Sequence, residues 1–230
     1  MILADVRIKS RQDWDKIFGM AKSGYLHAQM YESGKELIYK MMAFGVNWKN
    51  ARVLDLGCGN GRLAASLTEL PITSYVGIDP IVECIDFCKE SFSQYSKFTF
   101  EHIDLQNSMY NPKGQIKSDV YSFPFADKSF DIIIALSVFT HLQSLSEAKN
   151  FIKEMYRLLN LDGFSLTTWF RSPPNLVNFR NIEHTTYKES DIMSMLRGFE
   201  TIYTDSGHND QWHDQWLILG KLKNNKIILL

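Results

Sequence analysis

The amino-acid sequence predicts an α/β fold in which helices cover both faces of a doubly wound, mostly parallel β-sheet. Three observations lead to this prediction. Strand-like and helix-like segments alternate after residue 51, the nearly all-apolar run FDIIIAL at 130–136 is typical of a parallel strand covered on both faces, and a glycine cluster joins a short strand to a helix. With 230 residues, 45% of them apolar, the chain can bury the core of one large domain.

The first fifty residues read as helical, and we expect an N-terminal helical cap (1–50) on a ligand-binding domain (51–230). Apolar residues at helical spacing support two helices, with Trp14, Ile17, Phe18 and Ala21 in the first and Leu37, Ile38, Met41 and Met42 in the second. Between them, Gln29, Tyr31 and Gly34 read as a polar break that belongs either to a lid or to plain helix packing. Gly45 ends the second helix.

From residue 51 onward the elements follow in order. The expected strands are 52–56, 74–78, 98–103, 130–136, 164–169, 199–204 and 216–222, and the expected helices are 63–70, 81–95, 146–159 and 190–196. The link at 205–215 is turn-like and too short for a crossover helix. It therefore favours a hairpin, which makes the final strand antiparallel.

Composition excludes several classes of protein. Lys and Arg total 25 against 26 Asp and Glu, so no broad basic field indicates a nucleic-acid or membrane partner. Three cysteines, Cys58, Cys84 and Cys88, form no disulfide framework and suit a reducing cytoplasm. We expect no signal peptide, because residues 1–9 show no long apolar stretch after a basic start. The longest apolar run, 132–139, is far shorter than the ~20 residues that span a bilayer. We expect no metal site, because neither the cysteines nor the histidines at 208 and 213 have a standard ligand spacing.

The glycine cluster carries the first indication of a ligand. Gly57, Gly59 and Gly61 alternate between the first strand and its helix in the string VLDLGCGNGRL at 53–63. Glycine there allows positive φ and lets the backbone approach a ligand closely, while N–H groups at a helix start face an anion. The alternative is a strand–turn–helix with glycines used only for packing.

An acidic residue strengthens the ligand-binding interpretation. Asp79 ends the second strand, 18 residues after Gly61, where a carboxylate can accept hydrogen bonds from both ribose hydroxyls. Asp55, two residues before Gly57, is placed to reach the same ligand. A nicotinamide-binding loop reads G-x-G-x-x-G, and its third glycine would fall at Arg62, which disfavours a dinucleotide.

Four strings together resemble the class I S-adenosylmethionine (SAM)-dependent methyltransferases. They are DLGCGNGR at 55–62, GID at 77–79, FPFADKSFD at 123–131 and EMYRLLNLDG at 154–163. The resemblance covers about residues 51–170 well, is weaker over 171–230 and is weakest over 1–50. It implies a Rossmann-like sheet of seven strands with the last antiparallel, SAM as cofactor and methyl transfer as the reaction.

The resemblance also implies roles for individual residues. Asp55 and the loop 57–61 would hold the methionine end of SAM, Asp79 the ribose, Asp104 the adenine amino group, and Ser137 would lie beside the methionine. The cofactor-binding residues it implies are Asp55, Gly57, Cys58, Gly59, Gly61, Asp79, Pro80, Asp104, Leu105 and Ser137.

The position of the adenine-binding acid leaves two candidates. Eighteen residues separate Asp104 from Phe123, where the family has about five, and Asp119 lies at the familiar short distance. We favour Asp104 because it caps the third strand, and the extra length then reads as an insertion. Asp119 is the alternative.

Methyl transfer from a sulfonium is an in-line displacement that needs alignment and exclusion of water, and it needs a base only for a hydroxyl or a protonated amine. His141, after the fourth strand, is the candidate catalytic base, because imidazole titrates near neutral pH and this edge of the sheet binds ligands. A histidine that caps the next helix or shapes the pocket is the alternative.

The acceptor is the least determined feature. We expect a small molecule methylated on oxygen or nitrogen (a metabolite, sugar or lipid headgroup), with Arg171, Phe179 and Arg180 as candidate contacts in a monomer or homodimer. The string ALSVFT at 135–140 lacks the N/D-P-P-Y/F pattern of amino-adenine and cytosine methyltransferases. A protein methyltransferase and a non-catalytic SAM-binding regulator are the alternative functions.

Overall fold

The computed structural model describes residues 25–172, 184–210 and 213–223. Its strands are β1 (Arg52–Leu56), β2 (Ser74–Asp79), β3 (Phe98–His102), β4 (Phe130–Ala135), β5 (Leu159–Arg171), β6 (Thr186–Tyr187), β7 (Phe199–Asp210) and β8 (His213–Leu222). Its helices are α2 (Tyr25–Ala43), α3 (Arg62–Leu67), α4 (Val82–Ser91), α5 (Leu145–Leu158) and α6 (Glu189–Met195).

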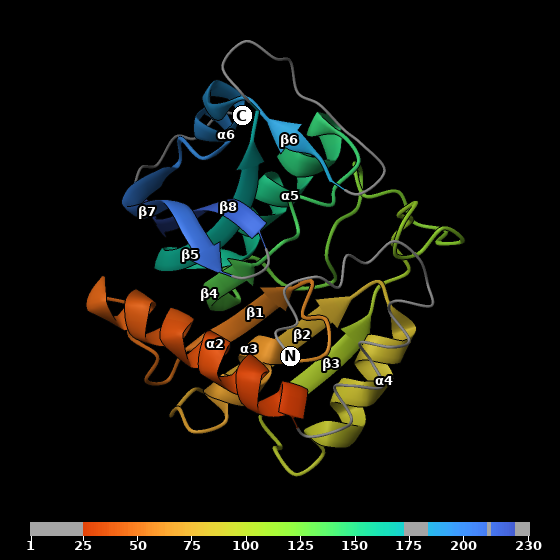
Figure 1. Cartoon of the computed structure of the whole chain (residues 1–230), viewed down its shortest axis with the longest axis vertical. Helices are drawn as coiled ribbons and strands as arrows, with labels where there is room; N and C mark the ends of the chain where they lie inside the picture. Colours follow the sequence, from red (N-terminus) through yellow and green to blue (C-terminus); the bar gives the residue numbers. More distant parts are fainter. Residues whose placement is uncertain (1–24, 173–183, 211–212, 224–230) are drawn as a thin grey trace.

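The strands form one sheet of eight, of which seven follow the order β3-β2-β1-β4-β5-β8-β7 and correspond to the seven predicted strands (Figure 1). β1 pairs in parallel with β2 and β4, β2 with β3, and β4 with β5. β8 runs antiparallel to both β5 and β7, as expected for the final strand. β6, a two-residue strand that the sequence did not predict, pairs with the end of β5 outside this order. Because the chain leaves β1 for β2 on one side and returns to β4 on the other, a crevice is expected beyond their carboxyl ends.

The hairpin of β7 and β8 is longer than predicted. Pairing continues to Asp210 opposite His213, so most of the expected link at 205–215 is strand. The polar residues of this stretch read as a turn, but the backbone groups of polar residues also pair in an antiparallel ladder that has one face in water. Two register irregularities, between Thr201 and Tyr203 and between Ser206 and His208, interrupt the ladder.

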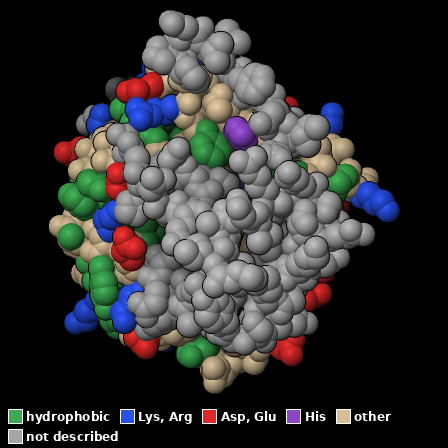
Figure 2. All heavy atoms as spheres, in the orientation of Figure 1, with side chains coloured by type: hydrophobic (Ala, Val, Ile, Leu, Met, Phe, Trp, Pro, Cys, Tyr) green, Lys and Arg blue, Asp and Glu red, His purple; other side chains and the backbone are tan. Residues whose placement is uncertain are grey.

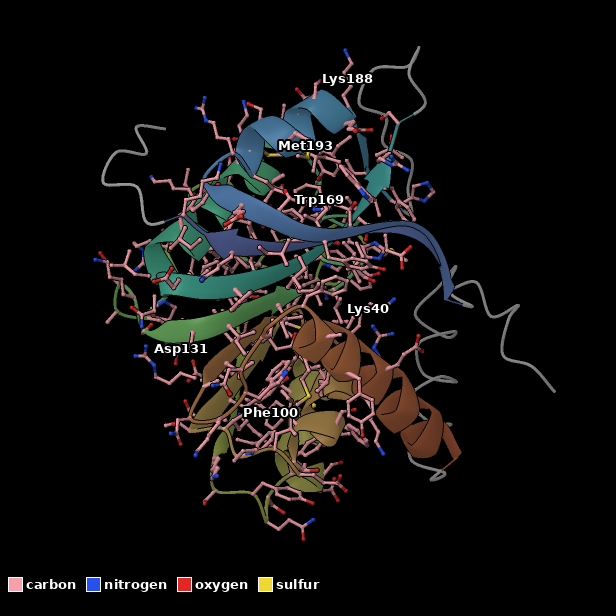
Figure 3. All side chains as sticks on the ribbon, turned by 90° about the vertical axis from the view of Figure 1, so that its left-hand side faces the viewer. Lys40, Phe100, Asp131, Trp169, Lys188 and Met193 are labelled. Atoms are coloured by element: carbon pink, nitrogen blue, oxygen red, sulfur yellow. The ribbon has the colours of Figure 1, made fainter. Side chains whose placement is uncertain are left out.

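β1 and β4 are buried on both faces, and this explains their apolar sequences. Ile132 and Ile134 of β4 join a core on the side of α2, α3 and α4, whereas Ile133 and Ala135 join a core on the side of α5 and α6. Phe100 belongs to the first core and Trp169 to the second; both are labelled in Figure 3. The alternation places the side chains from Ile132 to Ala135 in the two apolar layers in turn, as parallel strands covered on both faces require, whereas Asp131 near the start of β4 is half-buried and pairs with Arg52.

α2 is continuous, and the predicted polar break at residues 29–34 is wrong. Gly34 lies within the helix and is buried against α3, where an added Cβ would overlap Ser66 Oγ and lie 2.9 Å from the carbonyl oxygen of Arg62. The glycine therefore allows close helix packing rather than a turn. Lys40, which is labelled in Figure 3, lies near the other end of α2. It forms an ion pair of 3.2 Å with Asp205 of β7.

The described surface carries mixed charge. Figure 2 shows acidic and basic side chains interspersed around the described part of one face, in keeping with a net charge of −1 for the chain. Among the described residues, no helix is long and apolar enough to cross a bilayer.

The close packing at Gly34 predicts the sign of a stability change. Helix propensity alone would make Gly34→Ala more stable by about 1 kcal/mol. We expect the opposite, a loss of about 1–3 kcal/mol in the free energy of unfolding, because the new Cβ overlaps Ser66 Oγ. Urea unfolding measures the change. Ser66→Ala in the same chain should restore part of the loss, and a Gly34→Ala protein more stable than wild type would contradict the packing argument.

Candidate functional site

A cavity of about 200 Å³ lies beyond the carboxyl ends of β1 to β4, at the predicted edge of the sheet. Most of its wall is apolar and includes Ile103, Leu105, Phe123, Leu136, Leu142 and Phe151. Its polar contributors include Asp79, Asn107, Ser137 and His141. An apolar cleft with a few convergent polar groups at the switch point of an α/β sheet is typical of a small-molecule or cofactor site.

The glycines after β1 all adopt positive φ, with values of 70° at Gly57, 52° at Gly59 and 84° at Gly61. Their surroundings differ. A Cβ on Gly57 would lie 2.7 Å from Val138, and one on Gly61 would lie 2.6 Å from the Phe92 ring. A Cβ on Gly59 would meet no atom within 4 Å, and Gly59 lines the cavity. The first and third glycines therefore permit packing, and the middle one leaves space at the cavity wall.

The amides of this turn do not point freely at a ligand, which differs from the prediction. Gly57 and Cys58 donate their N–H groups to the carbonyl of Ile78 at 2.8 and 3.0 Å. Gly59 donates to Asp79 Oδ2 at 2.9 Å, and Gly61 donates to the carbonyl of Cys58 at 3.0 Å. These four donors fasten the turn to the end of β2 and to itself.

Asp79 lies at the centre of the site. Its carboxylate is 6% exposed, accepts N–H groups from Gly59 on Oδ2 and from Ile81 on Oδ1, each at 2.9 Å, and lines the cavity beside Pro80. Burial raises the pKa of Asp79 to about 6, although these two hydrogen bonds oppose the rise. An ionised carboxylate has about four acceptor sites. Two therefore remain for donors in the cavity, which suits a pair of ribose hydroxyls.

Asp55, Cys58 and Gly61 were expected at the ligand but do not line this cavity. The buried carboxylate of Asp55 accepts a hydrogen bond of 2.6 Å from the hydroxyl of Tyr75, on the neighbouring strand β2. Burial raises the pKa of Asp55 to about 7, against the opposing effect of that hydrogen bond. Cys58 lies beneath the turn, where its thiol and that of Cys88 lie 3.7 and 3.4 Å from the carbonyl oxygen of Gly59. These side chains support the turn from inside the core.

Neither candidate for the adenine-binding acid lines the cavity. The carboxylate of Asp104 accepts hydrogen bonds from Asn111 Nδ2 at 2.9 Å and from the N–H of Gln115 at 3.1 Å, and these lower its pKa. It organises the insertion, while Asp119 is exposed to solvent. The insertion instead places Asn107, Tyr110 and Ser118 on the wall, together with the predicted Leu105. Asn107, Tyr110 and Ser118 were not predicted as site residues from the sequence, where the length of the insertion was the available signal.

Ser137 lines the cavity in a strained conformation. Its φ of 58° lies in the left-handed region, which costs energy for a residue other than glycine and is often found at functional sites. Its N–H donates to Thr168 Oγ1 at 2.7 Å, and its carbonyl accepts from Thr140 Oγ1 at 2.8 Å. The conformation turns the chain at the end of β4 and directs the following residues along the cavity.

His141 also lines the cavity, one turn after β4. Its N–H donates to the carbonyl of Val138 at 2.9 Å, and its own carbonyl accepts a hydrogen bond of 2.9 Å from Asn107 Nδ2. Its ring meets the Tyr110 ring edge-on, with centroids 4.9 Å apart. The backbone fixes His141 at the wall, where it suits either a base or a pocket-shaping residue.

The string FPFADKSFD has a structural role in this chain. Arg157 of α5 donates to the carbonyls of Phe123 at 2.9 Å and of Phe125 at 2.8 Å, and Glu154 accepts the N–H of Phe123 at 2.9 Å. These bonds fasten the loop before β4 to α5. They hold the Phe123 ring at the cavity wall.

The predicted acceptor contacts are only partly described. Arg171 is exposed, with an ion pair of 3.3 Å to Glu189 and its guanidinium 4.9 Å from the centre of the Trp216 ring. Phe179 and Arg180 lie outside the described residues, as do the side chains at 208 and 213. No group of three or more potential metal ligands occurs among the residues that are described.

Fold and cavity together define a Rossmann-like α/β protein with a cavity at the switch point of its sheet. Comparison with known proteins gives the family. Residues 54–167, close to half of the chain, match the methyltransferase domain family. The chain belongs to the class I SAM-dependent methyltransferases, whose cofactor is SAM.

Three known proteins illustrate the similarity. A 2-phytyl-1,4-β-naphthoquinone methyltransferase of Arabidopsis thaliana is 33% identical over 55% of this chain and 45% of its own length. A tRNA U34 carboxymethyltransferase of Campylobacter fetus is 28% identical over 78% of this chain and 63% of its own. The crystal structure of a magnesium protoporphyrin IX methyltransferase from Synechocystis, with bound S-adenosylhomocysteine, superposes with a TM-score of 0.61 at 17% identity, covering 84% of this chain and 83% of that one.

These comparisons support the assignment of the domain to its family more strongly than any conclusion about a whole protein. The chain spans only 32% to 63% of the length of five curated relatives that it resembles. The structural similarity at 17% identity shows the fold.

The buried Asp55 predicts a pH dependence of stability. Its folded pKa of about 7 lies above the ordinary value of 3.8, so the folded state binds more protons than the unfolded state between these values. The free energy of unfolding should therefore fall as pH rises from about 4 to 7. We expect Asp55→Asn to lose less stability than wild type between pH 5 and pH 8, by on the order of 1–3 kcal/mol.

Urea unfolding at the two pH values measures the difference. Asp86→Asn, at an exposed position on α4, is the matched control and should follow the wild-type dependence. An Asp55→Asn protein with the same dependence as wild type would contradict the interpretation.

Proposed function

We propose that the cavity binds SAM and that the protein transfers its methyl group to an oxygen or nitrogen atom of a small molecule. One observation carries the proposal: the buried carboxylate of Asp79 lines the cavity with two acceptor sites to spare, next to the open space at Gly59. Asp79 would accept both ribose hydroxyls. Ile103, Leu105 and Phe123 would enclose the adenine.

The methionine end of SAM is assigned to the wall formed by Gly57, Gly59 and Ser137. All three residues line the cavity at the ends of β1 and β4, which are neighbours in the sheet. The close contact of Gly57 with Val138 shows that these two segments meet at the wall. Asp55 and Cys58 contribute indirectly in this proposal, because they support the turn from below.

When bound, SAM supplies the electrophilic methyl group. The protein contributes alignment of the acceptor and exclusion of water from a largely apolar cavity. We assign His141 as the general base that removes a proton when the acceptor is a hydroxyl or a protonated amine. Its support is its position on the wall after β4, where its N–H donates to the carbonyl of Val138, the residue that follows Ser137.

A small-molecule acceptor has two supports. The chain has a net charge of −1 and mixed surface charge, which does not favour a polyanionic acceptor. Two of the similar proteins are named for a naphthoquinone and a porphyrin. The tRNA-modifying relative makes nucleic acid the acceptor class to test alongside.

The same proposal includes the cap and the location of the protein. The segment 1–50 would cover the domain 51–230, supported by the packing of α2 on α3 next to the glycine turn. A cytoplasmic location is supported by Cys58, Cys84 and Cys88, all of which are buried free thiols.

Binding to Asp79 is tested by calorimetry with SAM, S-adenosylhomocysteine and NAD. Wild type should bind the first two and not NAD. Asp79→Asn should weaken SAM binding by about tenfold or more, because a charged acceptor of two hydroxyls is lost. Asp119→Asn, at an exposed acid outside the cavity, should leave the affinity unchanged. Binding of NAD in preference to SAM, or an Asp79→Asn protein with wild-type affinity, would refute the placement.

The role of His141 is tested by radiolabelled methyl transfer to a panel of metabolites and to bulk tRNA. His141→Ala should retain SAM affinity and lose about 10²–10⁴-fold in the rate of transfer to a hydroxyl acceptor. His184 is a half-buried histidine whose ring meets that of Phe170 edge-on, and His184→Ala is the matched control, which should transfer at the wild-type rate. An unchanged rate in His141→Ala would leave the histidine with a pocket-shaping role only.

A further inference from the structure

The insertion between β3 and β4 forms a closed loop over residues 104–116. Asn107 and Asn111 exchange two backbone hydrogen bonds, both of 3.0 Å. At the base of the loop, Gln106 donates to the carbonyl of Ile116 at 2.7 Å, and Ile116 donates to that of Asp104 at 3.0 Å. The carboxylate of Asp104 adds its bonds to Asn111 and Gln115. The loop therefore has its own hydrogen-bonded framework.

This loop is also fastened across the cavity to the segment after β4. Asn107 Nδ2 donates to the carbonyl of His141 at 2.9 Å, and Gln143 Nε2 donates to Ser108 Oγ at 2.6 Å. Asn107 Oδ1 accepts the N–H groups of Met109 and Tyr110 at 3.0 and 3.1 Å. The side chain of Asn107 therefore joins the loop to His141 and also fixes the backbone at Tyr110.

The position of Tyr110 follows from this framework. Its ring lines the cavity and meets the ring of His141 nearly at a right angle, 87°. Tyr110 lines the cavity together with Asp79 and with Leu105, which belongs to the same loop after β3. Burial raises the pKa of the Tyr110 phenol, and the negative charge of Asp79 adds to the rise. Tyr110 therefore shares the cavity wall with Asp79, which the proposed function assigns to the ribose, and contacts His141, which it assigns to the acceptor.

We propose that Tyr110 is a cofactor-binding residue whose ring packs on the adenosyl group held by Asp79, and that the 104–116 loop holds it there. The inference rests on the proposed function, because it assumes that the cavity binds SAM. The ring would contact the nucleoside part of the ligand and not its amino-acid part. Any 5′-thioadenosine nucleoside should therefore gain from the contact, whether or not it carries the methionine chain.

The experiment compares two ligands by calorimetry, S-adenosylhomocysteine and 5′-methylthioadenosine, which lacks the amino-acid part. Tyr110→Ala should weaken binding of both by a similar factor of about tenfold, as expected for loss of an aromatic ring that packs on a nucleoside. Tyr110→Phe should keep affinities within about threefold of wild type, because the ring remains. Val120→Ala is the control in the same inserted segment, since Val120 is 77% exposed and outside the cavity wall.

Tyr110→Leu controls for collapse of the loop, because leucine fills much of the same space without a ring. This variant should lose affinity to the same extent as Tyr110→Ala. Wild-type affinity for both ligands in the Ala and Leu variants would overturn the inference. So would a loss confined to S-adenosylhomocysteine, since the contact would then be with the amino-acid part. A wild-type protein that binds neither ligand would instead refute the proposed function itself.

Discussion

A buried carboxylate between two strand ends holds the site together. Asp79 accepts the N–H of Gly59 from the turn after β1 and the N–H of Ile81 at the start of α4. A carboxylate buried to this degree is costly unless it is hydrogen-bonded, so the two donors must stay in place for the group to remain charged. The same bonds fix the shape of the glycine turn. The geometry of the cavity therefore depends on a side chain whose other acceptor sites face into it.

Two further sets of hydrogen bonds hold the loops that complete the cavity wall. Arg157 and Glu154 of α5 hold the backbone at Phe123, and Asn107 joins the inserted loop to His141. Both sets use charged or amide side chains to satisfy backbone groups that no strand or helix pairs, as loop segments near a core require. The regular sheet thus ends in loops that are held in place by side chains from α5 and from the insertion.

The sequence predicted the sheet well because its strands are buried on both faces. The run Phe130–Ala135 was recognisable from its apolar residues alone, and the glycine turn from its place between a strand and a helix. It failed where a residue's role depends on a distant neighbour. Gly34 read as a helix break because its contact with Ser66 is invisible in sequence. The hydrogen bond between Asp55 and Tyr75, 20 residues apart, was equally invisible. The β7–β8 hairpin read as a turn because polar residues in an edge ladder resemble a loop.

The sequence by itself determined the class of fold, the glycine turn and the acid that ends β2, since each depends on local spacing and on the period of apolar residues. Tertiary structure decided which side chains reach the cavity. It turned Asp104 towards Asn111 and placed Tyr110 beside His141, because hydrogen bonds within the insertion, and between it and the segment after β4, set the path of the loop. Those bonds join residues far apart in the chain, and no periodic pattern encodes them.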